Sequence, residues 1–304
     1  MTPSKTIEVR ELTKSFGKFQ ALSGLNLTVE AGQVHGFLGP NGAGKTTAIR
    51  VLLGLIRADG GTATVLGQDP WKDVVELHRR LAYVPGDVSL WPKMSGGEAI
   101  DLLGSLRGGL NESRRAELIE RFELDPTKRG RQYSKGNRQK VAIIAALASD
   151  AELLILDEPT SGLDPLMGNV FQEVVGEAKE RGTTVLLSSH ILAEVESLAD
   201  RLSVIRNGVV VQSGTLEQLR GHTRTNISAT MSVVPPQDVL AGLQDVRLDG
   251  NRLFASVDAS RVGAAMTVLA PYGLTALTVE PPSLESLFLR LYEDEGNDEV
   301  STNG

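Results

Sequence analysis

Between about residues 33 and 205, short apolar runs alternate with segments whose apolar residues recur at helical spacing. Three of the runs are almost wholly apolar, which is typical of strands buried on both faces of a parallel sheet. These runs are residues 33–39, 153–157 and 183–189. The main helical segments are residues 46–56, 138–149 and 168–182. The alternation predicts an α/β domain whose parallel sheet is covered by helices.

The segments on either side of this region follow a different pattern. Residues 5–32 alternate apolar and polar side chains, which predicts antiparallel strands. Asn207 and Gly208 stand between two apolar runs, which is a strong signal for a tight hairpin. A first domain is therefore predicted over residues 1–222.

After residue 222 the pattern restarts with another order of elements. Residues 223–292 contain in turn a predicted strand, helix, hairpin, helix and strand. This βαββαβ order predicts a small ferredoxin-like α+β domain. A final helix is predicted to begin after its cap, Ser283, and to carry one apolar stripe. The acidic tail, residues 293–304, has no apolar face and is predicted to be disordered.

Composition and charge narrow the class of protein. The net charge of −7 argues against a nucleic-acid partner, because phosphate backbones are bound by basic faces. The chain has no cysteine, so disulfides and thiolate metal sites are excluded. Residues 1–17 lack the apolar core of a signal peptide, and no apolar run is long enough to span a bilayer. We therefore expect a cytoplasmic protein whose role at any membrane depends on a partner.

A glycine-rich motif at residues 39–47, GPNGAGKTT, fits the pattern G-x-x-x-x-G-K-[ST] of a loop that binds nucleoside triphosphates. Its glycines let backbone N–H groups converge on a phosphate, and the following helix adds a positive dipole. Lys45 is expected to reach the β- and γ-phosphates, and Thr46 to offer its hydroxyl to Mg²⁺. The alternative, a glycine-rich turn before an ordinary helix, is disfavoured by the strand before the motif and the helix after it. The predicted ATP-binding residues are Gly39, Pro40, Asn41, Gly42, Ala43, Gly44, Lys45, Thr46 and Thr47.

Two adjacent carboxylates end the second buried run. A phosphate-binding loop needs an acidic partner strand to hold Mg²⁺, and Asp157 is placed to serve as that ligand. Glu158 follows at once and is predicted to be the general base for the attacking water. On its own, the pair could also be a charged strand exit before a turn.

With these motifs, residues 5–220 resemble the ATP-binding subunits of ABC transporters. The resemblance implies a P-loop ATPase domain that carries an antiparallel β subdomain and a helical subdomain. The stretch SGLDP, residues 161–165, resembles the loop that meets the second subunit, and this implies that Asp164 takes part in the nucleotide site.

Two further side chains have roles only through this resemblance. His190 matches the family's switch histidine and is an expected catalytic residue; the alternative is a turn histidine with satisfied hydrogen bonds. Phe16 stands where the family stacks an aromatic ring on adenine; the alternative is a core phenylalanine. The remaining histidines, His35, His78 and His222, match no family motif and are predicted to be structural.

The family's signature loop has two candidates in this chain. The stretch MSGGEA has the expected Ser-Gly-Gly, but its Ser95 lies 62 residues before Asp157. The family places the signature at a helix start some two dozen residues before the acidic strand, and Ser134 of YSKGN lies 23 residues before Asp157. MSGGEA is therefore predicted to be a turn and helix cap. The expected signature residues are Ser134, Lys135, Gly136 and Asn137, with Lys135 in place of a common glycine.

The main departure from the family is at Gly86, where the family has a glutamine that ligates Mg²⁺ and relays the nucleotide state to the membrane subunit. Glycine has no side chain for either task. Asp87 could supply a carboxylate oxygen instead, or water could fill the position.

The resemblance implies the function and the partners. ATP and Mg²⁺ would bind between two copies arranged head to tail, on the inner face of the membrane beneath a separately encoded permease. Residues 281–292 resemble the ending of ATPase subunits in the antibiotic- and drug-efflux branch, which implies export. A soluble ATPase acting on ribosomes remains an alternative, although such proteins have two phosphate loops in one chain. A chromosome-type clamp would need a long coiled coil, and a non-catalytic regulator would lack Glu158 or His190.

Overall fold

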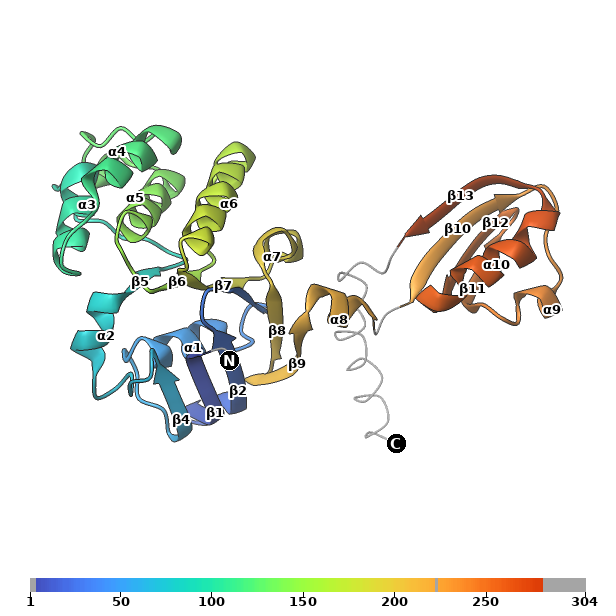
Figure 1. Ribbon diagram of the computed structural model, residues 1–304, viewed down its shortest axis with the longest axis horizontal. Coiled ribbons are helices and arrows are strands. Elements are labelled where there is room, and N and C mark those ends of the chain that lie inside the picture. The colour runs from blue at the N-terminus through green and yellow to red at the C-terminus, as the bar shows by residue number, and fades with distance from the viewer. Residues whose placement is uncertain (1–3, 222–223, 281–304) are drawn as a thin grey trace. The chain divides into compact units, whose positions relative to one another are not determined.

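The computed structural model describes residues 4–221 and 224–280, and its central feature is a six-stranded sheet in the order β5-β6-β7-β3-β8-β9 (Figure 1). The pairs β5/β6, β6/β7, β7/β3 and β3/β8 are parallel. The three runs predicted as buried strands are β3, β6 and β7, and every residue in them is buried, which confirms the prediction. The bounds are β3 Val34–Leu38, β5 Leu81–Val84, β6 Leu153–Asp157, β7 Thr184–Ser189, β8 Arg201–Arg206 and β9 Val209–Thr215.

The register of this sheet decides which loops meet at its carboxyl edge. Leu38, the last residue of β3, pairs with Ser189 at the end of β7. Asp157, the last residue of β6, pairs with Ser188. The three strands therefore end side by side, so the loops that follow them emerge together.

A second, antiparallel sheet has three strands in the order β2-β1-β4. Its strands β1 and β2 confirm the antiparallel strands predicted from residues 5–32, and β4 joins them from later in the chain. Helix α1 contacts β2 and β4 of this sheet and β6 of the other. Ile49 of α1 is fully buried with Leu22 and Ile155, so one core joins the helix to both sheets. The bounds are β1 Lys5–Phe16, β2 Phe19–Glu30, β4 Gly60–Val65 and α1 Lys45–Leu52.

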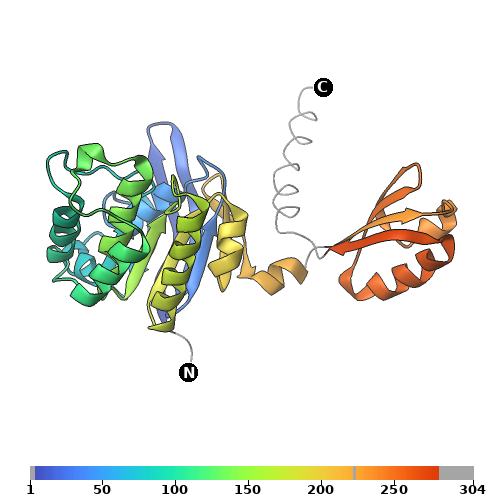
Figure 2. The same ribbon diagram turned by 90° about the horizontal axis from the view of Figure 1, so that it is seen from above.

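The helices between β5 and β6 form the helical subdomain that the resemblance implies. Helix α5 contacts α3, α4 and β5, and α5 and α6 lie side by side (Figures 1 and 2). From Gln139 to Leu147 every residue of α5 is buried, because other elements cover it on all sides. Besides α1, the helices of this first unit are α2 Val74–Arg80, α3 Gly96–Ser105, α4 Glu112–Arg121, the 3-10 helix η1 Gly130–Gln132, α5 Lys135–Leu147, α6 Pro165–Glu180 and α7 Leu192–Leu198.

Helix α3 begins at the stretch that resembled a signature motif. Ser95 is its N-cap: the Ser95 hydroxyl accepts from the Glu98 amide at 3.2 Å, and the Glu98 carboxylate accepts from the Ser95 amide at 2.7 Å. A Cβ added at Gly96 would lie 2.1 Å from the Tyr133 hydroxyl oxygen, so this helix start packs tightly. The predicted turn and cap are confirmed, with a capping box as the physical reason.

The chain divides into two compact units between Gly214 and Thr215, which places α8 (Leu216–Gly221) in the second unit. The predicted boundary, residue 222, lies at the far end of this helix. The second unit has an antiparallel sheet in the order β11-β12-β10-β13, and its core includes Ile227, Leu253 and Leu269. Its other elements are β10 Thr225–Met231, α9 Gln237–Leu240, β11 Gln244–Asp249, β12 Arg252–Val257, η2 Ala259–Arg261, α10 Val262–Leu269, η3 Ala270–Tyr272 and β13 Leu274–Glu280.

Some predictions fall outside the described residues: the structural role of His222, the helix after Ser283 and the disordered tail 293–304. Within residues 4–221 and 224–280, no helix combines the length and apolar character needed to cross a membrane.

Candidate nucleotide-binding and catalytic site

The phosphate-binding loop connects β3 to α1 and needs its glycines for conformation and space. Gly42 and Gly44 have φ angles of 85° and 107°, in the left-handed region that favours glycine. A Cβ at Gly44 would also lie 2.7 Å from the carbonyl oxygen of Ala21. Gly44 caps α1 without a side-chain acceptor, so the first-turn amides are oriented toward the loop as anion donors.

Lys45 lies inside this loop and is only 5% exposed. Its Nζ donates to the carbonyl oxygens of Gly39 at 2.6 Å and Pro40 at 3.0 Å, and lies 3.4 Å from Oε1 of Glu158. Burial lowers the pKa of Lys45, while the neighbouring carboxylates of Glu158 and Asp157 oppose that shift. The ammonium is therefore held at the loop by weak carbonyl acceptors, which a phosphate oxygen could replace.

Thr46 and Asp157 meet at the carboxyl edge of the sheet. The Thr46 hydroxyl donates to Oδ2 of Asp157 at 3.1 Å, and the Ser188 hydroxyl donates to Oδ1 at 2.5 Å. Asp157 is only 4% exposed. A hydroxyl and a carboxylate in contact supply the hard oxygen donors that Mg²⁺ prefers, so these residues fit the ion.

Glu158 stands between Lys45 and His190. Its Oε1 lies 3.4 Å from the Lys45 Nζ and 3.3 Å from Nδ1 of His190. Its φ of 47° is unusual for a residue with a side chain and costs on the order of 1–3 kcal/mol. Bonds from its amide to the Ser188 carbonyl and hydroxyl, at 3.1 and 3.3 Å, hold it there. The backbone is thus fixed in a strained conformation that brings this carboxylate to Lys45 and His190.

The predicted signature loop sits at the start of α5, as expected from its spacing. Ser134 caps the helix, since its hydroxyl accepts from the Asn137 amide at 3.2 Å. Lys135 donates to the Ser161 hydroxyl at 2.8 Å, and a Cβ at Gly136 would lie 2.3 Å from the Gly162 carbonyl. This loop therefore rests on the segment just after Glu158 of its own chain. The sequence carried no signal for the Lys135–Ser161 contact.

Asp164 and Phe16 each have an identifiable local position. Asp164 caps α6, where its Oδ1 accepts from the Met167 amide at 3.0 Å. Phe16 lies at the tip of the β1–β2 hairpin, 49% exposed, with the Lys14 ammonium 5.5 Å from its ring centroid. Phe16 is therefore not a core residue, and its ring is open to a stacking partner. The contact of either residue with nucleotide stays a prediction.

Gly86 packs against the backbone of the acid pair. A Cβ at this position would lie 3.1 Å from the carbonyl oxygen of Asp157 and 3.4 Å from Cβ of Glu158, so glycine permits a close approach. The preceding residue, Pro85, accepts a 3.1 Å bond at its carbonyl from the amide of Gln139, which is fully buried. Asp87 is exposed and lines a recess of about 300 Å³ with Arg131 and Arg138. Sequence reasoning missed Gln139, because nothing in the pattern of α5 separates it from other buried positions.

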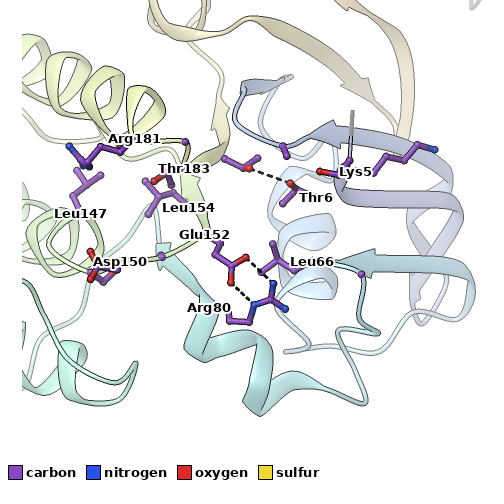
Figure 3. A pocket seen from close by; sticks show the side chains of 18 residues that line it. Lys5, Thr6, Leu66, Arg80, Leu147, Asp150, Glu152, Leu154, Arg181 and Thr183 are labelled. Carbon is purple, nitrogen blue, oxygen red and sulfur yellow. Dashed lines mark hydrogen bonds and ion pairs between the residues drawn. The ribbon is translucent and has the colours of Figure 1, made fainter. Parts of the chain in front are cut away.

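A larger cavity, of about 740 Å³, lies at the opposite edge of the sheet (Figure 3). Among its lining residues, Glu152 precedes β6 and Thr184 begins β7, and Arg80 binds Glu152 with N–O distances of 2.6 and 2.9 Å. Leu154, the residue of β6 that lines this cavity, lies three residues before Asp157, which is about 10 Å along the strand at a rise of roughly 3.3 Å per residue. A separate recess of about 420 Å³ is lined by Glu158, His190 and Glu194 and belongs to the catalytic edge.

Known proteins are similar to this chain in sequence and in fold. The model of the ABC transporter family matches residues 22–161. The daunorubicin/doxorubicin resistance ATP-binding protein of Streptomyces peucetius is 36% identical over 308 residues, covering 95% of this chain and 93% of that protein. The linearmycin resistance ATP-binding protein of Bacillus subtilis is 32% identical, with 94% and 97% covered. A solved ATP-binding subunit of an ABC transporter has a TM-score of 0.66 and 31% identity, covering 71% of this chain and 92% of that one.

Proposed function

This chain belongs to the ABC transporter family, as one of its ATP-binding and ATP-hydrolysing subunits, and we propose that it powers export through a separately encoded membrane subunit. The proposed cargo is a drug, an antibiotic or a lipid-like molecule. Two relatives that match almost end to end are resistance proteins for daunorubicin/doxorubicin and for linearmycin, which favours export over a ribosomal role. The observation that carries the catalytic part is the Glu158 carboxylate, set between Lys45 and His190 beside Thr46 and Asp157.

The proposed chemistry is attack of water on the γ-phosphorus, with cleavage of its bond to the oxygen that bridges the β-phosphate. Glu158 takes the proton from the water, and ADP leaves with the bridging oxygen. Lys45 and the amides of the phosphate-binding loop hold the β- and γ-phosphate oxygens. His190 fixes the Glu158 carboxylate and approaches the γ-phosphate from the end of β7. Thr46 and Asp157 would hold Mg²⁺, which supplies positive charge to the phosphate oxygens when bound.

The second half of the site is proposed to come from a second copy arranged head to tail. The loop Ser134–Asn137 opens a 13-residue helix, so its amides and the Ser134 hydroxyl suit the γ-phosphate held by the other copy. Within its own copy, this loop packs on the segment after Glu158, through the contacts of Lys135 with Ser161 and of Gly136 with Gly162. Asp164 and Phe16 complete the proposed site, the latter by stacking on adenine.

The remaining assignments concern place and accessory structure. We infer that the protein works at the cytoplasmic face of the membrane, held there by the membrane subunit. The first unit is proposed to be the ATP-binding domain and the second a ferredoxin-like accessory domain. Its strand order β11-β12-β10-β13 and its βαββαβ sequence of elements support that proposal.

The experiment that tests the catalytic proposal is Glu158→Gln in the purified full chain. The amide cannot take the proton, so kcat should fall by about 10²–10⁴-fold while ATP binding is retained. An ATP-bound dimer should also accumulate, detectable by size-exclusion chromatography with light scattering. Turnover close to that of the wild type would remove Glu158 from the role of base. Export is tested separately, by ATP-dependent drug efflux in cells that also express the membrane subunit.

A further inference from the structure

One carboxylate joins the two loops that carry Glu158 and His190. Oε1 of Glu194 accepts a hydrogen bond from the Thr160 hydroxyl at 2.6 Å, and Oε2 accepts one from the Ser189 hydroxyl at 2.9 Å. Thr160 lies two residues after Glu158, and Ser189 lies immediately before His190. Glu194 is therefore bonded to both loops, through partners that lie two residues from Glu158 and one residue from His190.

The hydrogen bonds of Glu194 to Thr160 and Ser189 form a bridge between the two loops. At the Ser189 end, this bridge fixes the backbone on both sides of His190. The Ser189 hydroxyl is buried and accepts a 2.9 Å bond from the amide of Ile191, the residue that follows His190. The same hydroxyl is bonded to Glu194, which is in the first turn of α7. The Ser189 hydroxyl thus links the residues before and after His190 and is itself anchored on the Glu194 carboxylate.

The Thr160 end restrains the segment after Glu158. The Ser161 amide donates to the Glu158 carbonyl at 3.1 Å, forming a turn that contains Thr160. A bond from the Thr160 hydroxyl to Glu194 fixes that turn relative to α7. If the loop after Glu158 moved relative to the loop before His190, one of the hydrogen bonds to the Glu194 carboxylate would break. Such charge-assisted bonds are stronger than hydrogen bonds between neutral groups.

We propose that Glu194 is a positioning residue for ATP hydrolysis, because it sets the separation of Glu158 and His190 by bonding to Thr160 and Ser189 together. The inference rests on the proposed function, since it assumes that Glu158 and His190 act on water and the γ-phosphate. Glu194 acts through these two residues. A displacement of about 1 Å in such a site lowers the rate by roughly a hundredfold, so loss of the bridge is expected to affect turnover strongly.

The test uses Glu194→Ala in the purified full chain, with Glu196→Ala as the matched control. The control substitution removes the same type of side chain from the same helix, but at a position about 200° around the helix axis from Glu194. We expect Glu194→Ala to lower kcat by about 10- to 100-fold, with KM for ATP and binding of a fluorescent ATP analogue changed by less than about threefold. Glu196→Ala should leave all three unchanged. A Glu194→Ala enzyme with the kcat of the wild type would overturn the proposal.

A double-mutant cycle distinguishes positioning from general stabilisation. Thr160→Val keeps the shape of the side chain and removes one bond of the bridge, and we expect it to lower kcat by at least about fivefold. Combined with Glu194→Ala, it should add less than about twofold, because both changes break the same bridge. The proposal would be contradicted if the effects of the two substitutions on kcat multiplied in the double variant, or if Thr160→Val alone left kcat unchanged. The Thr160→Val result stands even if Glu194→Ala fails to fold.

Failure of this inference is separable from failure of the proposed function. If the wild type hydrolyses ATP, Glu158→Gln does not, and the Glu194 and Thr160 variants retain full kcat, only the positioning role is wrong. If Glu158→Gln retains full kcat, the catalytic assignment is wrong and the positioning role fails with it.

Discussion

Acid should destabilise the first unit through His35, a buried histidine that the proposed chemistry does not use. His35 is 1% exposed, and burial, followed by the charge of Arg201, lowers its pKa from 6.5 to about 4. Its Nδ1 lies 3.3 Å from the Gln33 amide nitrogen, and its Nε2 lies 2.9 Å from the Ser203 hydroxyl. If Gln33 donates to Nδ1, the neutral ring has both nitrogens bonded, and a proton added at Nδ1 would face another donor.

The size and sign of the effect follow from the two pKa values. Between pH 6.5 and about 4, the unfolded chain takes up a proton that the folded unit refuses, so stability falls as the pH falls. The full contribution is about 3 kcal/mol, because each pKa unit corresponds to about 1.4 kcal/mol. Roughly 2 kcal/mol of this should be lost between pH 7 and pH 5. Above the unfolded pKa the contribution is fully present.

The assay compares urea unfolding of the wild type with that of His35→Phe over this pH range. Both tryptophans, Trp71 and Trp91, lie in the first unit, so tryptophan fluorescence reports its unfolding. Loss of the ring's hydrogen bonds should make His35→Phe less stable at pH 7, and the difference should shrink by about 2 kcal/mol at pH 5. Parallel stability curves for the two proteins would refute the reasoning, since they would mean that His35 does not titrate differently on folding.

Two further predictions concern the site. Ser134→Arg should abolish ATP hydrolysis without lowering the melting temperature of the first unit by more than a few degrees. Ser95→Ala should instead cost about 1 kcal/mol of stability through the lost cap and leave kcat unchanged. The opposite pattern in an ATPase assay and in thermal unfolding would reverse the assignment of the signature. Asp87→Ala should raise the Mg²⁺ concentration needed for half-maximal hydrolysis more than it changes ATP affinity without metal, if Asp87 serves in place of the glutamine absent at Gly86; superimposable Mg²⁺ titrations would leave Asp87 with a structural role only.

Much of the fold was predictable because its signals are local. Continuous apolar runs identified β3, β6 and β7, and the alternation of apolar and polar side chains identified β1 and β2. The cap at Ser95 was likewise readable, since a capping box lies within four residues. The sequence left Phe16 with two interpretations, a stacking ring or a core residue, and its 49% exposure in the structure decided against the core. The division between the two units was less accessible, because α8 carries no sequence mark that assigns it to one side.

The sequence alone determined the residue types of the site: a glycine loop whose conformation excludes side chains, a lysine and a threonine after it, and two carboxylates at a strand end. These follow from the chemistry of neighbouring positions along the chain. Only the tertiary structure decided which of them touch. The register of β6 against β7 brings Glu158 to His190, and it sets Thr160 and Glu194, 34 residues apart, within one hydrogen bond. Periodicity identifies buried faces but leaves open which distant segments meet, because that depends on strand order and packing in three dimensions.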